Sequence, residues 1–173
     1  QSLEFSHGVI EELKKSLEAE IAKNANLKSE NEAMQMRCNS LEKRTCELEK
    51  RITNQEQYSR NHNIEIKGVE KRENERVSDI VSQIGAAIGE PIAFSDIESC
   101  HRVSTRNPEK SNIIVQFKSR AKRDVTLKKA KKTRLTNLQI GLNSPNAIFV
   151  NEHLCPALKS LLGRAIRRKH EHK

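Results

Sequence analysis

Apolar residues between positions 9 and 57 recur in a seven-residue pattern that predicts a long helix with one apolar stripe. No Gly or Pro interrupts the chain between Gly8 and Gly68, and Glu, Lys, Leu and Ala, which all favour helix, dominate this stretch. Counting heptads from Ile10 as position a places apolar side chains at most d positions over six heptads. A 3.5-residue repeat sustained over this length predicts a left-handed coiled coil.

The apolar stripe is interrupted by Asn24 and Asn31 at position a and by Glu20 at position d. Polar residues in a seam lower its stability and usually select the register or the number of helices. A weak, purely structural seam is the alternative interpretation.

Three consecutive heptads carry Arg at position g and Glu at position e, beginning at Arg37, Arg44 and Arg51. Between parallel helices these positions face each other, so the guanidinium can pair with the carboxylate while its stem covers the seam. The pattern is similar to a known trimer-favouring motif of short parallel coiled coils. It predicts a parallel homotrimer, and a dimer held by ordinary g–e′ pairs is the alternative. The residues expected to mediate self-association are Leu13, Leu17, Leu27, Met34, Arg37, Cys38, Leu41, Glu42, Arg44, Leu48, Glu49 and Ile52.

After residue 60 the pattern changes to short apolar runs of both strand and helix periodicity. The expected elements are a strand at 64–69, a helix at 77–88 ended by Gly89 and Pro91, strands at 97–103 and 113–117, and a basic helix at 121–134. The order β-α-β-β-α predicts a ferredoxin-like domain over residues 60–142, similar to RNA-recognition domains, whose last strand could come from residues 135–142.

Residues 143–173 are expected to form a small basic C-terminal α/β domain. Ile148–Val150 has the composition of a strand, and Pro156 suits the first turn of a helix. The helix that follows has an apolar stripe, which should pack on this strand or on the preceding domain and leave its basic side outward. The fold class is therefore α+β: a coiled coil at 9–57, the RNA-recognition-like domain at 60–142 and the basic domain at 143–173.

RNA-recognition domains stack bases on three aromatic side chains of their two central strands. The corresponding positions here are Glu65, Asn112 and Ile114, so all three aromatics are absent. Base stacking on the sheet is therefore not expected to be the main means of binding. Phosphate contacts from Lys and Arg are expected instead.

The formal net charge of +9 is concentrated at the C-terminal end, where residues 118–173 carry 15 Lys and Arg against 3 Asp and Glu. Such asymmetry favours a polyanionic partner, here single-stranded RNA or DNA, although a solvated basic surface is the alternative. The residues expected to contact nucleic acid are Arg60, Arg102, Lys110, Lys118, Arg120, Lys122, Arg123, Lys128, Lys129, Lys131, Lys132, Arg134, Arg164, Arg167 and Arg168.

The sequence contains no pattern of residues typical of a catalytic or metal site. Cys38, Cys46, Cys100 and Cys155 lack the CxxC spacing of zinc sites and are expected to be free thiols in a reducing compartment. Glycine-rich phosphate loops, HExxH and GxSxG are absent, so we expect no enzyme activity, no cofactor, no metal and no small-molecule substrate. The longest apolar runs are too short to span a membrane, and an intracellular protein, nuclear or cytoplasmic, is expected.

The run Glu56–Val69 resembles a segment of the few-polyhedra (FP) protein family of baculoviruses, which has relatives in insect proteins and retrotransposons. The segments His101–Val103, Ile113–Phe117 and Ile148–Leu154 extend the resemblance, which covers about residues 35–170. The order of elements also resembles the first open-reading-frame protein of long interspersed retroelements, which joins a trimeric coiled coil, an RNA-recognition-like domain and a basic C-terminal domain.

The resemblance implies a non-enzymatic, chaperone-like oligomer that coats single-stranded nucleic acid. The basic positions of the family match Arg60, Arg102, Lys110 and Lys118, and also Arg164 and Arg167. Because relatives usually continue into an aromatic strand pair after the last helix, the C-terminal domain is expected to be incomplete. The alternative function is a coiled-coil adaptor whose basic surface serves solubility or nuclear import.

Overall fold

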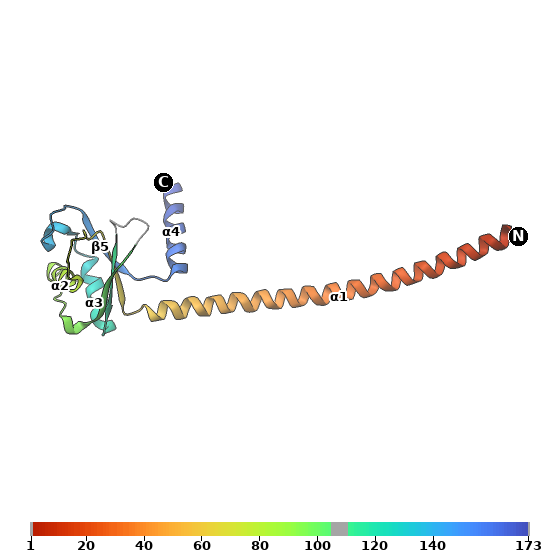
Figure 1. The fold of residues 1–173 in the computed structure, drawn as a ribbon, viewed down its shortest axis with the longest axis horizontal. Helices are drawn as coiled ribbons and strands as arrows, with labels where there is room; N and C mark the ends of the chain where they lie inside the picture. Colours follow the sequence, from red (N-terminus) through yellow and green to blue (C-terminus); the bar gives the residue numbers. More distant parts are fainter. Residues whose placement is uncertain (1, 105–110, 173) are drawn as a thin grey trace. The chain divides into compact units, whose positions relative to one another are not determined.

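The computed structural model describes residues 2–104 and 111–172 as an α+β protein with a long N-terminal helix, which confirms the α+β class predicted from the sequence (Figure 1). The chain divides between Ile52 and Thr53 into two compact units. Each unit is described by itself below.

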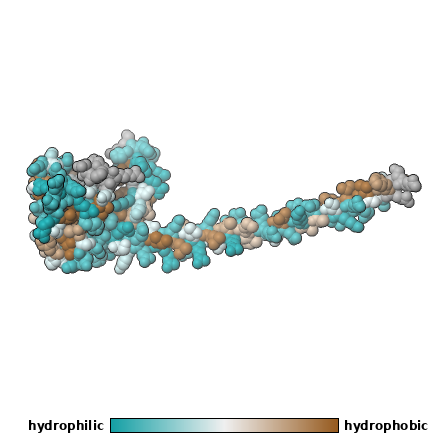
Figure 2. All heavy atoms as spheres, viewed as in Figure 1, coloured by the Kyte–Doolittle hydropathy of each residue, from teal (hydrophilic) through white to brown (hydrophobic). Residues whose placement is uncertain are grey.

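The first unit consists of a single helix. Helix α1 spans Ser2–Ser59 and contains the whole stretch predicted to be helical, with its last turns in the second unit. Figure 2 shows apolar residues recurring along this helix between hydrophilic ones. Leu13, Leu27 and Leu41 keep 63%, 54% and 53% of their surface exposed, so the stripe has no partner among the described residues of this chain.

The second unit is built on a five-stranded sheet in the order β2-β3-β1-β5-β4, with antiparallel pairing throughout. The central strand β1 pairs with β3 on one side, where Ile66 lies opposite Ile113, and with β5 on the other, where Ile66 lies opposite Val150. The strands are β1 (Asn63–Lys67), β2 (Ile97–Val103), β3 (Asn112–Phe117), β4 (Leu135–Thr136) and β5 (Ala147–Glu152).

The core lies on one face of this sheet, under helices α2 (Val77–Ala87) and α3 (Arg120–Ala130). Helix α4 (Pro156–Glu171) lies on the other side of the strands (Figure 1). Two short 3-10 turns, η1 (Phe94–Asp96) and η3 (Asn137–Ile140), complete the unit. The innermost apolar side chains of the core cluster, each at most 1% exposed, are Ile64, Ile66, Val81, Ile84, Ile113, Val115 and Phe117.

The last two strands of the sheet differ from those predicted from the sequence. The strand expected within residues 135–142 consists only of Leu135–Thr136, because η3 follows and ends at Gly141 in the left-handed region. Strand β5, which the sequence analysis placed in a separate domain beginning at residue 143, pairs with β1 instead. Ile148 and Val150 alternate with exposed residues, so that β5 can extend the buried face beside β1. Helix α3 also ends at Ala130, before the predicted residue 134.

Truncating Phe117, which is 1% exposed, should destabilise the second unit strongly. Phe117→Ala leaves a cavity among close-packed β-branched side chains, and we expect a loss of about 3–5 kcal/mol in the free energy of unfolding. Phe94→Ala, at a site that is 57% exposed, is the matched control and should cost less than about 1 kcal/mol. Urea unfolding of the full chain measures both, and equal losses would contradict the assignment of the core.

Candidate nucleic-acid interface

The face of the sheet opposite the core carries polar and charged side chains. Successive residues of a strand point to opposite faces, and the buried positions of β1 alternate with Glu65 and Lys67. Glu65 lies opposite Ile114 of β3 and Asn151 of β5, and Lys67 lies opposite Phe149. The strand register therefore places a cation and an aromatic ring side by side on this face.

Glu65 is the buried anion of this face, with a side chain that is only 6% exposed. It accepts hydrogen bonds from Asn112 Nδ2 at 2.9 Å and from Lys159 Nζ of α4 at 3.1 Å. Burial alone would raise the pKa of this carboxyl, but the hydrogen bond and charge of Lys159, the charge of Lys67 and the Asn112 amide together hold the pKa below its ordinary value. Glu65 is thus ionised at neutral pH and ties α4 to the sheet.

Three hollows, of about 550, 500 and 320 Å³, share lining residues around β1 and β5. Lys67 lines the first and second, Lys131 lines the second and third, and Phe149 lines the first and third. Because each pair of hollows shares a residue, they form one surface, which we call the β5 surface. Its basic and aromatic members are Lys67, Lys131, Arg134, Lys159 and Phe149, its acidic members are Glu65, Glu70 and Glu152, and its other polar members are Ser111, Asn112, Thr133, Asn146 and Asn151.

More than half of the basic residues proposed from the sequence are exposed. Arg120 is exposed beside Asp124, with Nε and Oδ2 3.8 Å apart. Within residues 2–104 and 111–172, the others have no side-chain partner and are available for a ligand. They are Lys118, Lys128, Lys131, Lys132, Arg134, Arg164, Arg167 and Arg168. Lys110 lies outside the described residues.

Arg102, which the sequence analysis placed among the binding residues, serves the fold instead. Its guanidinium forks onto the carboxylate of Glu75 and donates to the main-chain oxygens of Val69, Glu70 and Ser111. The side chains of Arg102 and Glu75 are only 10% and 11% exposed. Although burial would raise the pKa of Glu75, the hydrogen bond from Arg102 and the neighbouring donors and charges lower it. The contacts of Arg102 and Glu75 hold the end of β2 against the segment that follows β1.

Three basic residues of α3 also have internal partners. Lys122 and Lys129 reach Glu90 from one side of the helix, with Nζ–O distances of 2.7 and 2.6 Å. Hydrogen bonds from these two lysines lower the pKa of Glu90. Arg123 is buried, donates to the main-chain oxygen of Asn63 at 3.2 Å and pairs with the neighbouring Asp124. These three cations have partners within the fold that hold α3 in place, and the Lys129 side chain keeps 42% of its surface exposed.

Arg60, which directly follows α1, is partly exposed and also has hydrogen-bond partners within the chain. Its guanidinium donates to the main-chain oxygen of Glu56 at 2.9 Å, and its side chain keeps 26% of its surface exposed. Nearby, the amide of Gln57 donates to the His153 carbonyl and accepts from the Cys155 N–H. This last turn of the helix is thereby joined to the segment between β5 and α4.

The apolar stripe of α4 does not pack as expected. Leu161, Leu162 and Ile166 keep 53%, 50% and 49% of their surface exposed. Leu162, Ile166 and Lys159 line the 500 Å³ hollow together with Lys131, so that space remains between the helix and the sheet. The basic segments of α3 and α4 therefore share one hollow through Lys131 and Lys159, whereas Arg164, Arg167 and Arg168 do not line it.

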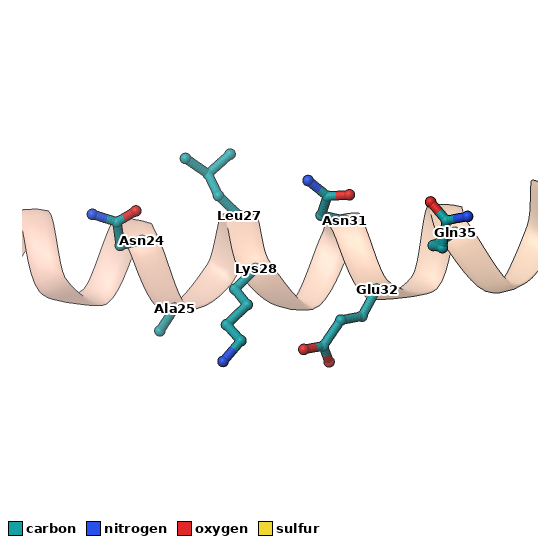
Figure 3. Close-up of a pocket in the computed structure, with 7 residues that line it drawn as sticks. All are labelled: Asn24, Ala25, Leu27, Lys28, Asn31, Glu32 and Gln35. Carbon is teal, nitrogen blue, oxygen red and sulfur yellow. The ribbon is translucent and has the colours of Figure 1, made fainter.

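The residues proposed for self-association all lie on α1, and all are exposed. Figure 3 shows Asn24, Leu27 and Asn31 projecting from the same side of the helix, as consecutive a and d positions should. Ala25 and Lys28 project from the opposite side in the same view. Over residues 24–31 the helix thus presents its a and d positions, including the polar Asn24 and Asn31, on the same side.

The sequence analysis did not include Lys67, Phe149 and Lys159 among the site residues. Lys67 and Phe149 belong to strands that are far apart in the chain, and only the pairing of β1 with β5 brings them together. The available signal was the alternation of Phe149 with Ile148 and Val150, which predicts that the ring points away from the core.

No family model matches the chain, and a search of curated proteins finds no similar one. In the described parts of the chain, no helix is long and apolar enough to cross a membrane. The same parts contain no group of three or more His, Cys, Asp and Glu side chains that could hold a metal ion.

Replacing Arg102 should affect stability and leave ligand binding by the folded protein unchanged. Arg102→Lys keeps the charge but loses the fork onto Glu75 and most of the carbonyl contacts, so we expect a loss of about 2–3 kcal/mol in the free energy of unfolding. Arg76→Lys, on a side chain that is 77% exposed, is the control. If Arg102→Lys unfolded like the wild type but bound oligonucleotides more weakly, Arg102 would be a binding residue and not a structural one.

Proposed function

We propose that this chain is a non-enzymatic, self-associating protein that binds single-stranded RNA or DNA through phosphate contacts. The observation that carries this proposal is the group of exposed cations at the end of α3, Lys128, Lys131, Lys132 and Arg134, none of which has a side-chain partner in the described part of the chain. Unpaired cations close together repel one another, and a phosphate chain relieves this repulsion while releasing condensed counterions.

The β5 surface supports the proposal because it continues from these cations across the sheet. Lys131 and Arg134 line one hollow, and Lys131 shares the next with Lys67 and Lys159. Glu65 at the centre of this surface is buried and paired with Lys159 and Lys67, so it presents little negative charge to a ligand. The exposed Glu70 and Glu152 also line the hollows, where Lys67, Lys131, Arg134 and Lys159 outnumber them. A groove that combines positive charge with exposed ring surface is the usual site for a single strand.

The strand order also supports an RNA-recognition-like fold. β1 and β2 flank β3, α2 connects β1 to β2, and β5 adds to the free side of β1. A ferredoxin-like split βαβ domain has a similar arrangement, and in our proposal β5 takes the place of its fourth strand. The resemblance of residues 56–69 to the few-polyhedra family is consistent with the same class of protein.

We propose further that α1 assembles the chain into a parallel homotrimer, with a dimer as the alternative. The helix exposes its a and d side chains along its length, and isolated helices with an exposed apolar stripe are marginal in water. Association would bring two or more basic surfaces to one strand, which raises affinity without any new type of contact.

Reversing three free charges should weaken binding to every nucleic-acid sequence alike. The variant Lys131→Glu, Lys132→Glu and Arg134→Glu should lose at least about tenfold in affinity in 0.1 M salt. The slope of log affinity against log salt should fall in magnitude by about two, because each lost phosphate contact with a single strand contributes about 0.7. Fluorescence anisotropy with mixed-sequence oligonucleotides at several salt concentrations measures both.

The matched control reverses Lys15, Lys43 and Lys50, three exposed residues at f positions of the heptad. It makes the same change in net charge on a different part of the chain, and should change the slope by much less. Equal effects of the two triple variants would indicate a general charge effect and refute a localised phosphate site. Weak binding by the wild type that never saturates would favour the adaptor function.

Breaking the helical seam should separate the chains. The double variant Leu41→Asp and Leu48→Asp places charges at two d positions, where they would be buried between helices, and should give a monomer. Lys43→Asp and Lys50→Asp, at f positions on the same stretch, should leave the oligomer intact. Multi-angle light scattering measures the mass of each protein, and a monomeric wild type would refute self-association.

A further inference from the structure

Phe149 is an exposed aromatic residue in the middle of a strand. Its neighbours Ile148 and Val150 are 5% and 7% exposed and belong to the core, whereas Phe149 is 60% exposed on the opposite face. An exposed phenylalanine is not unusual by itself, and Phe94 is exposed to a similar extent. Phe149 differs because it lines two of the three hollows of the β5 surface, and Phe94 lines none of these three.

The side chains around the ring have the chemistry that a nucleotide requires. Lys67 lies opposite Phe149 in the strand register, is about half exposed and lines the same 550 Å³ hollow. Asn112 and Asn146 also line that hollow. The Asn112 amide already donates to Glu65, whereas the amide of Asn146 offers both a donor and an acceptor for the edge of a base. On the other side of the ring, Lys131 and Arg134 line the 320 Å³ hollow and are free to hold phosphates.

Gly68, which lines the larger hollow, lets the end of β1 lie against the start of β5. Its φ of +85° is in the left-handed region, and a Cβ at this position would lie 2.3 Å from the Ala147 main-chain oxygen. Asn137, which is fully buried, donates from its amide to the main-chain oxygens of Gly68 at 2.8 Å and Asn146 at 2.9 Å. The end of β1 and the segment before β5 are therefore held together, and the hollow is formed by the fold before any ligand arrives.

We infer that Phe149 is a stacking position for one unpaired base, with Lys67 beside it and with Lys131 and Arg134 holding the neighbouring phosphates. The inference rests on the proposed function and adds a base contact to it, at a strand position that the sequence analysis did not consider. Stacking on a ring does not depend on the identity of the base, since every base has a π-face. Bases of a duplex already stack on each other, so this site selects single strands over duplexes.

The experiment compares full-length proteins on two strands of equal length, an oligothymidylate and the same sugar–phosphate chain without bases. The wild type should bind the base-bearing strand about five- to hundredfold more tightly than the abasic strand at the same salt concentration. Phe149→Leu keeps an apolar side chain but removes the ring, and should lose most of this difference while its affinity for the abasic strand stays unchanged. Phe94→Leu is the matched control and should behave as the wild type.

A second measurement uses the absence of tryptophan from the chain. Phe149→Trp introduces a single tryptophan, whose fluorescence should be quenched by the base-bearing strand and not by the abasic strand. Phe94→Trp should show no such quenching. If Phe149→Leu binds the oligothymidylate as the wild type does, and Phe149→Trp is not quenched, the stacking position is refuted and phosphate binding remains. If the wild type binds neither strand in dilute buffer, the proposed function fails, and the stacking position fails with it.

Discussion

The pairing of β1 with β3 on one side and with β5 on the other is the constraint on which the second unit depends. Because side chains alternate along a strand, this one register sends Ile64 and Ile66 into the core and leaves Glu65 and Lys67 on the opposite face. A slip by one residue would bury charge and expose the core. The register that stabilises the fold is therefore the same register that brings Lys67 next to Phe149.

The positive charge of the C-terminal half has two separate roles. Arg102, Lys122, Arg123 and Lys129 pair with carboxylates that are partly buried or exposed and donate to main-chain oxygens, and these contacts stabilise the packing of β2 and α3. The cations that remain unpaired gather at the end of α3 and along α4. A count of Lys and Arg in the sequence overstates the charge that is available to a ligand, because it cannot separate cations that have partners within the fold from cations that lack them.

Hydrophobic periodicity was sufficient to predict the long helix, the α+β class and most of the strands and helices of the second unit. It could not predict that β5 completes the sheet, because the pairing of β5 with β1 is a contact between segments about eighty residues apart. Nor could it predict the exposed stripe of α4, since an amphipathic helix has the same sequence pattern whether or not its apolar side is covered. Lys118, Lys131 and Arg134 were predicted as binding residues from the concentration of charge in residues 118–173, and all three are exposed.

The shortness of β4 has a further consequence for solubility. β4 pairs only with Ala147 and Ile148, so the outer edge of β5 from Phe149 to Glu152 has no strand partner among the described residues. Open edges of this kind invite strands of other molecules to add to them, and lysines nearby discourage such aggregation. Lys131 and Arg134 flank this edge. In the protein without a ligand, these two cations would repel other copies of the chain from the edge. A polyanion bound to the same cations would neutralise their charge and would also cover the edge.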